Sequence, residues 1–251
     1  MGKGRPMNCQ EGRDAGITRR EFIKVTGAIV LVAGIGGCSR TATDEGPAQA
    51  GTEGILVTAG EIPPANGYLL VDIEKCQGCM SCMLACSLIH EGVESLSLSR
   101  IQIIQSSFAG FPDDLTIAQC RQCVDPACVE ACPAGALTAE ARYGHVRMVD
   151  AEKCIGCGAC RDACPHTPSR AFLAADRAYD GTAKSRKCDL CANAAYHWDE
   201  AGGGPDGRQA CVAVCPVGAI LFTKKIPRQT DGGYMVDLRD RNWGRLGYPT
   251  S

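Results

Sequence analysis

Short apolar runs, four to seven residues long, alternate with cysteine-containing loops along most of the chain. Runs of this length, bounded by turn-forming residues, predict short strands rather than long helices. We expect strands at residues 67–73, 100–105, 146–149 and 170–174. A short helix is expected at residues 83–90, directly after the first cysteine-rich loop.

Sixteen of the eighteen cysteines fall into four groups of four. The first and third groups have the C-x2-C-x2-C-x3-C spacing of bacterial two-cluster ferredoxins. Closely spaced thiolates on a curled loop can supply most of the ligands of one iron–sulfur cubane, and a following proline keeps the chain from continuing as helix. The candidate metal ligands are Cys76, Cys79, Cys82 and Cys86; Cys120, Cys123, Cys128 and Cys132; Cys154, Cys157, Cys160 and Cys164; and Cys188, Cys191, Cys211 and Cys215.

Disulfides and zinc sites are the two other interpretations of so many cysteines. Regular Cys-x-x-Cys spacing with Cys-Pro endings is poorly suited to a disulfide framework, and zinc ribbons use two separate Cys-x-x-Cys pairs. The spacing therefore favours four [4Fe–4S] clusters.

A repeated unit connects the cysteine groups to the predicted strands. Residues 132–137 and 215–220 are nearly identical, each reading Cys-Pro-x-Gly-Ala followed by leucine or isoleucine. One such unit used twice makes a two-cluster ferredoxin module, so four uses make two modules. The predicted fold class is α+β, with tandem bacterial-ferredoxin-like modules of short strands and helices built around the clusters.

The N-terminus resembles an export signal. Residues 18–24 read Thr-Arg-Arg-Glu-Phe-Ile-Lys, which looks like the twin-arginine pattern with isoleucine in place of leucine. The apolar stretch 25–37 suits a signal sequence and is too short for an ordinary transmembrane helix. Because clusters are inserted in the cytoplasm, a folded cargo needs this route. We expect the protein in the periplasm or on the outer face of the cytoplasmic membrane; a chance basic–apolar terminus is the alternative.

Cys38 is a candidate lipid attachment site, because residues 35–38 resemble a lipobox. Cleavage at Ala48-Gln49-Ala50 and retention of the whole signal are the other two outcomes that remain open. Cys9 lies within the leader and is interpreted as an incidental free thiol.

The amino-acid composition limits the classes of function that fit this chain. Aromatic residues make up only 5% of the chain, so the clusters are expected to form part of the core. The formal net charge of −2, with no basic stripe, excludes a nucleic-acid-binding protein. We find no Ser/His/Asp set, paired carboxylates or phosphate-binding loop, so no catalytic residue is assigned and substrate chemistry is expected in another subunit.

All sixteen cysteines together, including the wide intervals between Cys123 and Cys128 and between Cys191 and Cys211, resemble a known family. Residues 67–225 are similar to the iron–sulfur electron-transfer subunits of the molybdopterin oxidoreductase (dimethyl sulfoxide reductase-like) superfamily. The sequence of the first cysteine group also looks like that of subunits that accompany tungsten aldehyde oxidoreductase-type enzymes.

The resemblance implies that ligands are exchanged between the first and fourth groups and between the second and third; pairing of successive groups is the alternative. This exchange nests an inner module within an outer one along the chain. With the N-terminal patterns and the tail added, the expected domains are a twin-arginine signal peptide at 1–37, a flexible linker at 38–66, an outer two-cluster module at 67–119 and 184–225, an inner two-cluster module at 120–183, and a C-terminal tail at 226–251, which wraps either a partner or the protein's own surface.

The function implied by the resemblance is the relay of single electrons in anaerobic respiration. The expected partners are a molybdopterin- or tungstopterin-type catalytic subunit and an integral-membrane quinone-reactive subunit. An electron-transfer subunit of a tungsten aldehyde oxidoreductase-type enzyme or a hydrogenase is one alternative. A structural or assembly module and a cluster-based sensor are two others, although no output domain for a sensor is recognisable.

A few residues near the ligands have two interpretations each. His166 either tunes a nearby cluster through a hydrogen bond or is an ordinary surface histidine. Arg186 and Lys187, next to Cys188, either offset the charge of a cluster or are solvated. The glycine-rich segment between Cys191 and Cys211, with His197 and Trp198, is expected to be a mobile or partner-facing loop.

Overall fold

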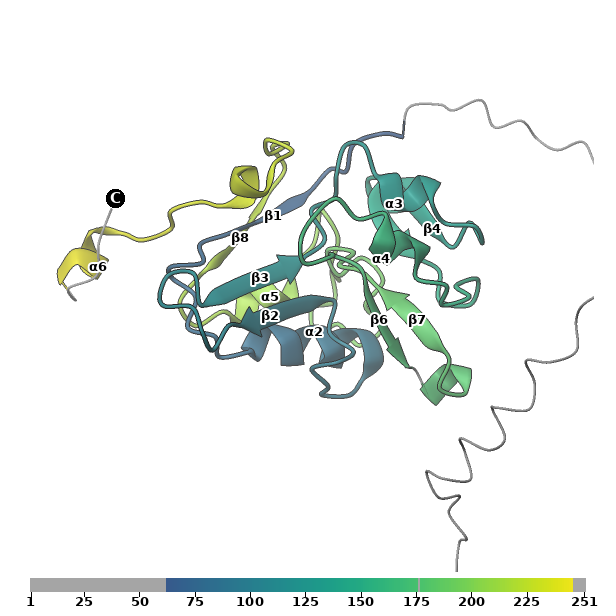
Figure 1. Cartoon of the computed structure of the whole chain (residues 1–251), viewed down its shortest axis with the longest axis horizontal. Helices are drawn as coiled ribbons and strands as arrows, with labels where there is room; N and C mark the ends of the chain where they lie inside the picture. Colours follow the sequence, from purple (N-terminus) through teal and green to yellow (C-terminus); the bar gives the residue numbers. More distant parts are fainter. Residues whose placement is uncertain (1–61, 176, 246–251) are drawn as a thin grey trace, which may run out of the picture. The chain divides into compact units, whose positions relative to one another are not determined.

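Small antiparallel strand pairs and short helices make up the part of the chain that the computed structural model describes, residues 62–175 and 177–245 (Figure 1). The predicted signal sequence, the candidate lipid site at Cys38 and most of the linker lie outside these residues. Within them, no helix is both long enough and apolar enough to cross a membrane.

Eight strands form four separate two-stranded antiparallel sheets in the described residues. Three of the sheets pair strands that follow one another in sequence, whereas the fourth pairs β1 with β8 and so joins the beginning and the end of the cysteine-rich region. The strands are β1 (Tyr68–Val71), β2 (Ile101–Gln105), β3 (Leu115–Gln119), β4 (Leu137–Glu140), β5 (Val146–Val149), β6 (Phe172–Ala175), β7 (Ala183–Arg186) and β8 (Ile220–Thr223).

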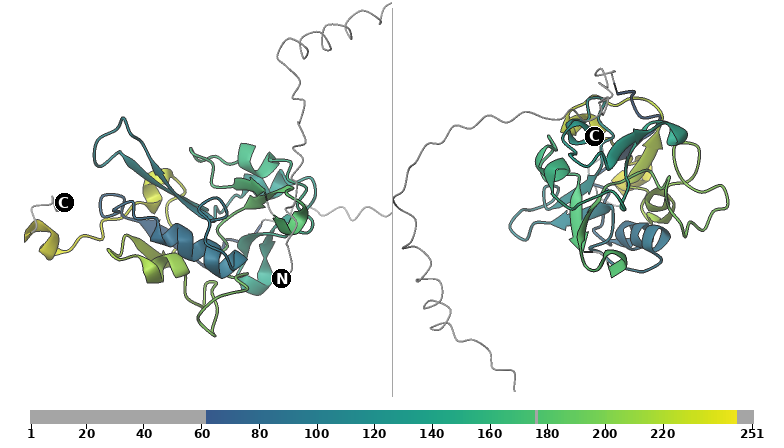
Figure 2. Two further views of the ribbon diagram at one scale, coloured as in Figure 1. Left: turned by 90° about the horizontal axis from the view of Figure 1, so that it is seen from below. Right: turned by 90° about the vertical axis from the view of Figure 1, so that its right-hand side faces the viewer.

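The α-helices of the described residues are α2 (Ser81–Glu91), α3 (Ala127–Glu130), α4 (Ala159–Asp162), α5 (Ala210–Val214) and α6 (Arg241–Arg245). Helix α2 ends at Gly92, whose left-handed conformation lets its N–H donate to the Leu88 carbonyl at 2.9 Å. Helix α2 packs on α5, and α3 packs on α4. Figures 1 and 2 show these two helix pairs in different parts of the molecule.

The ends of two strands differ from the sequence prediction at points where a backbone N–H donates to a side chain instead of to a neighbouring strand. The predicted strand 67–73 ends at Val71 because the Asp72 side chain turns back and accepts the Lys75 N–H. The predicted strand 170–174 begins only at Phe172, because the N–H of Arg170 donates to the thiol of Cys164. The predicted strand 146–149 is observed as β5 with the same bounds.

Four of the eight strands were not predicted, namely β3, β4, β7 and β8. Strand β7 reads Ala-Lys-Ser-Arg, which has no apolar alternation, yet Lys184, Ser185 and Arg186 are all buried. Strand β3 follows a polar hairpin loop and is recognised only by its pairing with β2. Each of these two strands pairs with the strand that precedes it in the sequence, β3 with β2 and β7 with β6.

Cysteine side chains form part of the main hydrophobic core. The core cluster contains aliphatic residues such as Leu69, Ile101 and Ile117 together with five buried cysteines. The five are Cys82, Cys86, Cys120, Cys188 and Cys211. This composition agrees with the low aromatic content and makes the thiols, with whatever they bind, part of the folded interior.

The segment after β8 returns along β1. The Val236 N–H donates to the Val71 carbonyl at 3.0 Å, and the Leu238 N–H donates to the Asp72 carboxylate at 2.7 Å. Lys75 Nζ donates to the Leu238 carbonyl at 2.9 Å. The beginning of the tail therefore lies on the protein's own surface, and Figure 1 shows α6 projecting away beyond it.

Candidate metal centres

The sixteen predicted ligand cysteines are all free thiols. The structure gathers them into four sets, each of which takes three cysteines from one of the four sequence groups and a fourth from another group. We call these set I (Cys76, Cys79, Cys82, Cys215), set II (Cys86, Cys188, Cys191, Cys211), set III (Cys120, Cys123, Cys128, Cys164) and set IV (Cys132, Cys154, Cys157, Cys160).

Sets I and IV each border a pocket. The pocket of set I is closed by Ile103, Ile117 and Ile220, and all four thiols of the set line it. The pocket of set IV is closed by Leu137, Val149 and Leu173. One cysteine at each pocket is exposed to solvent, Cys79 in set I and Cys157 in set IV. Each pocket therefore combines an apolar wall, four thiols and one edge open to water.

Sets II and III lie deeper. All four cysteines of set II are buried, whereas set III has two buried and two half-buried cysteines. Among the described residues, no three His, Cys, Asp or Glu side chains converge on one point as closely as a single bound ion would need. The thiols of sets I and IV instead line their pockets.

Each set contains one cysteine from a partner group, which is the juxtaposition that ligand exchange requires. The β1–β8 pair brings the loop around Cys76 to Cys215, and the contact between α2 and α5 brings Cys86 to Cys211. Packing of α3 on α4 does the same for Cys128 and Cys164. The first group is thus beside the fourth, and the second is beside the third.

Backbone amides point at five of the thiols. The N–H of Gln122 donates to Cys120 Sγ at 3.4 Å, and the N–H of Ser185 donates to Cys154 Sγ at 3.4 Å. Three further thiols accept a backbone N–H from a residue later in the sequence. Cys86 accepts from Arg100 at 3.4 Å, Cys164 from Arg170 at 3.3 Å and Cys215 from Ala219 at 3.2 Å. Such bonds stabilise negative charge on sulfur and are a means of tuning a bound iron–sulfur cluster.

Some of the thiols hold their protons tightly unless a metal replaces them. Burial, with the neighbouring Cys76 and Cys215, raises the pKa of Cys82 to about 12. Burial, with Cys120 nearby, likewise raises the pKa of Cys123 to about 12. Because thiolates are the ligands, cluster binding must release these protons, and crowded thiols are stabilised as thiolates only by a shared cation. The donor sets, the apolar walls and the amides all fit [4Fe–4S] clusters.

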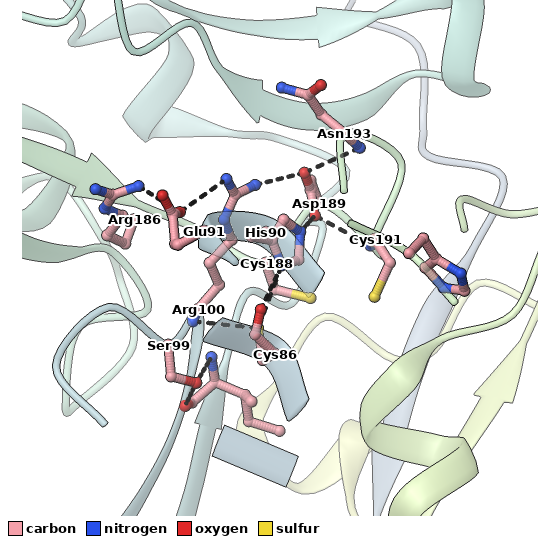
Figure 3. A network of polar contacts seen from close by, with 12 residues as sticks. Cys86, His90, Glu91, Ser99, Arg100, Arg186, Cys188, Asp189, Cys191 and Asn193 are labelled. Atoms are coloured by element: carbon pink, nitrogen blue, oxygen red, sulfur yellow. Dashed lines mark hydrogen bonds and ion pairs between the residues drawn. The ribbon is translucent and has the colours of Figure 1, made fainter. Parts of the chain in front are cut away.

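A charged network lies against set II (Figure 3). His90 Nδ1 donates to the Cys86 carbonyl at 2.7 Å and lies 3.7 Å from Cys86 Sγ, while Nε2 donates to Asp189 Oδ1 at 3.0 Å. The other oxygen of Asp189 accepts Arg100 Nη1 at 2.5 Å. Glu91 then bridges Arg100 and Arg186. Figure 3 shows this chain of contacts passing beside Cys86 and Cys188.

The network is electrostatically paired. Burial alone would raise the pKa of Asp189, but Arg100 and His90 lower it well below its usual range. Burial opposes a charged ring at His90, yet the Asp189 carboxylate raises the pKa of His90 to about 9. Asp189 is thus a carboxylate held between two cations.

Several of these residues were missed by sequence analysis. His90, Arg100 and Asp189 were not singled out, nor was Gln122, whose Nε2 donates to the Cys188 carbonyl at 2.8 Å. Position was the one available signal, because Gln122 and Asp189 lie between two candidate ligands in their own loops. Nothing local to His90 or Arg100 marks the role of either residue.

The structure decides between the two interpretations of three residues. His166 is buried, with Nε2 at 3.4 Å from Cys123 Sγ and Nδ1 at 2.8 Å from Asp231, so the surface interpretation is wrong. Arg186 and Lys187 are each 4% exposed, so neither is solvated.

The segment between Cys191 and Cys211 folds back on its own loop. The Gly204 N–H donates to the Leu190 carbonyl at 2.7 Å, and His197 Nε2 donates to the Arg208 carbonyl at 3.0 Å. Trp198 remains half exposed at 48%. The segment is therefore packed at its base and open to solvent at its tip.

A substitution at Gly156 tests how closely the ligand loop of set IV packs against β7. Its φ is +71°, and a Cβ there would lie 2.1 Å from the Ala183 carbonyl oxygen. We expect Gly156→Ala to lower the thermal midpoint and to reduce the iron content, because the Cys154–Cys157 loop must move away from β7. Gly181→Ala is the matched control, since φ is +76° there but no atom lies within 4 Å, and backbone strain of about 1–2 kcal/mol is the only cost. Equal loss in the two variants would contradict close packing.

Comparisons with known proteins agree with these donor sets. Residues 114–225 match the family described as a 4Fe-4S dicluster domain, and residues 73–88 match one described as a 4Fe-4S binding domain. Together the two matches span all four cysteine groups. The chain thus contains [4Fe–4S]-binding ferredoxin-type domains of mixed α/β structure.

Several characterised proteins are similar over about three-fifths of this chain. The beta subunit of NADH-dependent phenylglyoxylate dehydrogenase from Aromatoleum evansii is 38% identical over 62% of this chain, which covers only 30% of that subunit. The polyferredoxin-like subunit of the aliphatic sulfonate oxidoreductase of Pyrococcus furiosus is 37% identical over 59% of this chain and 70% of its own length.

The electron transport protein HydN of Escherichia coli is 30% identical over 62% of this chain and 87% of its own length. These three relatives are an electron transport protein and two subunits of oxidoreductases. The chain therefore belongs to the family of [4Fe–4S] ferredoxin-like proteins that act as electron-transfer subunits of oxidoreductase complexes.

Proposed function

We propose that this chain relays single electrons through four [4Fe–4S] clusters, one held by each of sets I to IV. The observation that carries this proposal is the grouping of sixteen free thiols into four adjoining sets. When bound, such clusters supply reversible one-electron storage. The cysteines ligate them, the backbone amides stabilise their charge, and the apolar walls exclude water.

The contacts between sets support a linear order. The thiolate of Cys82 in set I lies close enough to Cys211 in set II to raise its pKa, after burial and the set's own thiolates. Cys160 in set IV has the same effect on Cys128 in set III. Between sets II and III, Gln122 hydrogen-bonds both the Cys120 thiol and the Cys188 carbonyl. The proposed path is therefore I, II, III, IV.

Exposure supports electron entry and exit at the two ends of this path. Cys79 of set I and Cys157 of set IV are the exposed cysteines among the described residues, whereas set II is fully buried. Partners would thus approach the clusters of sets I and IV, and the interior clusters would be shielded from water and oxidants.

The path also divides the chain into the two proposed modules. Sets I and II belong to the outer module, residues 67–119 and 184–225, which contains β1, β8 and the α2–α5 pair. Sets III and IV belong to the inner module, residues 120–183, which contains the α3–α4 pair. Each module then holds two clusters.

For partners, we propose a molybdopterin- or tungstopterin-type catalytic subunit at one end and a membrane quinone-reactive subunit at the other. This proposal rests on the spacing of all sixteen cysteines and on the twin-arginine-like segment around Arg19 and Arg20. Export through that segment would place the protein in the periplasm or on the outer face of the membrane, with Cys38 as a candidate lipid anchor. Cell fractionation of the source organism tests the location.

A catalytic subunit of another oxidoreductase class is the second candidate partner. It is favoured by the 38% identity with the beta subunit of an NADH-dependent phenylglyoxylate dehydrogenase. Metal analysis of the complex purified from the source organism separates the two candidates, because molybdenum or tungsten would accompany a pterin enzyme.

Iron and sulfide analysis under anaerobic conditions, followed by a reductive titration monitored by EPR, tests the relay itself. Four cubanes predict about sixteen iron and sixteen sulfide per chain, with several reducible and magnetically coupled signals. Zinc in place of iron, or full loading with clusters that mild reductants cannot reduce, would contradict an electron-transfer role.

A further inference from the structure

Four buried cationic residues surround set III. Lys187, Arg121, Arg147 and Arg170 are 4%, 3%, 0% and 3% exposed. Basic side chains are rarely so completely buried unless negative charge accompanies them. The thiolates of set III, as ligands of a bound cluster, are the negative charge that these four residues share.

Each cation contacts the set or its loops. The ammonium group of Lys187 hydrogen-bonds the Cys120 side chain and lies near Cys128 and Cys164. Arg147 Nη2 donates to the Cys123 carbonyl at 2.7 Å. Arg121 directly follows Cys120 in the chain, and its guanidinium group lies over the Tyr234 ring.

Arg170 completes the group. Its backbone N–H donates to Cys164 Sγ, and its guanidinium group is near enough to that of Arg121 to lower the pKa of Arg121, in addition to the effect of burial. The guanidinium groups of Arg121 and Arg170 repel each other in the interior. Their proximity therefore indicates that a cluster bound by set III supplies negative charge beside them.

Acidic residues near set III are few and exposed. Asp231 lies 3.6 Å from Arg170 and 2.8 Å from His166, but its side chain is 55% exposed. Asp125, which lines the adjoining pocket with Cys123, is also exposed. Water and salt screen exposed charges, so these carboxylates offset little of the buried positive charge.

The cations near set II, in contrast, have acidic partners that are buried or half-buried. Arg100 and His90 share Asp189, whose side chain is 2% exposed, and Arg186 binds Glu91 at 2.6 Å. The positive charge near set II is therefore largely compensated within the protein, as Figure 3 shows. The two interior sets thus differ in net charge more than in burial.

From this difference we propose that the cluster of set III accepts an electron more readily than the cluster of set II. This inference rests on the proposed function, since it requires clusters in both sets. Added negative charge is stabilised by the uncompensated cations around set III, and the effect is strong in a medium of low dielectric. One electron passing from the reduced cluster of set II to the oxidised cluster of set III therefore moves downhill across Gln122.

The test is an EPR-monitored dithionite titration of the full-length, cluster-loaded protein and of Lys187→Met. The signal of set III is assigned beforehand with Cys123→Ser, which changes one ligand of that set. In the wild type, the signal of set III is expected before that of set II. In Lys187→Met, the equilibrium constant for reducing set III is expected to fall at least tenfold, a shift of about 59 mV for one electron.

Lys184→Met is the matched control. Lys184 is buried to a similar extent, 7% exposed, but its Nζ donates to the Cys154 carbonyl of set IV at 2.6 Å. This variant is expected to leave the midpoint of set III in place. Arg170→Gln retains the backbone bond to Cys164 while removing a charge, so it gives the same test if Lys187→Met does not load iron.

The outcomes separate the inference from the proposed function. A fully loaded protein in which set II is reduced before set III overturns the inference alone. So does an unchanged midpoint of set III in Lys187→Met or Arg170→Gln, or an equal shift in Lys184→Met. A wild-type protein that binds no iron would instead overturn the relay.

Discussion

Removal of the iron is expected to unfold the cysteine-rich part of the chain. Five cysteines lie in the main core cluster with Leu69 and Ile101, and aromatic residues make up only 5% of the sequence. A structural metal site in a small domain contributes about 10–16 kcal/mol of apparent folding free energy. The loss of even one such site is as large as the usual net stability of a domain, about 5–15 kcal/mol.

Far-UV circular dichroism and limited proteolysis, before and after anaerobic treatment with a chelator and an oxidant, measure this effect. The thiols are then kept reduced, so that new disulfides cannot hold the chain together. Reconstitution with ferrous iron and sulfide is the control and is expected to restore both the spectrum and the protease resistance. An iron-free, reduced chain that keeps its native spectrum would show that the aliphatic core suffices without clusters.

Substitution of Asp189 by alanine is expected to cost about 3–5 kcal/mol of stability, because it leaves buried charges without their partner. The Asp189 side chain is 2% exposed and binds both His90 and Arg100, and its Oδ1 also accepts the Cys191 N–H at 3.0 Å. Its loss therefore removes a counter-charge and a bond that shapes a ligand loop of set II. Anaerobic denaturant unfolding, with iron content measured on the same samples, gives both quantities.

Asp206→Ala is the control for Asp189→Ala. Asp206 also forms an ion pair, with Lys224 at 2.7 Å, but its side chain is 91% exposed. Exposed pairs of this kind contribute little, so the unfolding midpoint is expected to stay the same. If the two alanine variants lose equal stability, the paired network beside set II is not what stabilises this region.

Local sequence was enough to predict the chemistry of the site. The spacing of the sixteen cysteines identified the candidate ligands, because a cubane draws most of its ligands from one short loop. The pattern of apolar residues also predicted β5 with its observed bounds, and helix α2 within two residues of its ends. These features depend on neighbours a few residues away, which a single sequence displays directly.

Long-range contacts decided the rest. Lys184, Ser185 and Arg186 have the composition of an exposed turn, yet they form the buried strand β7, because β6 and the loop around Cys154 cover them. His166 was interpreted as one of two kinds of residue, and only the approach of Cys123 and Asp231 identified it as buried.

The charge around each set is the clearest division between what sequence and structure determine. Spacing along a loop is a local property, so the cysteine groups that supply three members of each set can be identified without a structure. The fold was needed to bring Lys187 beside Cys120 and Arg100 beside Asp189, 89 residues away. A side chain's burial and its opposing charges come from segments distant in sequence, so the electrostatic contrast between sets II and III appears only once the chain has folded.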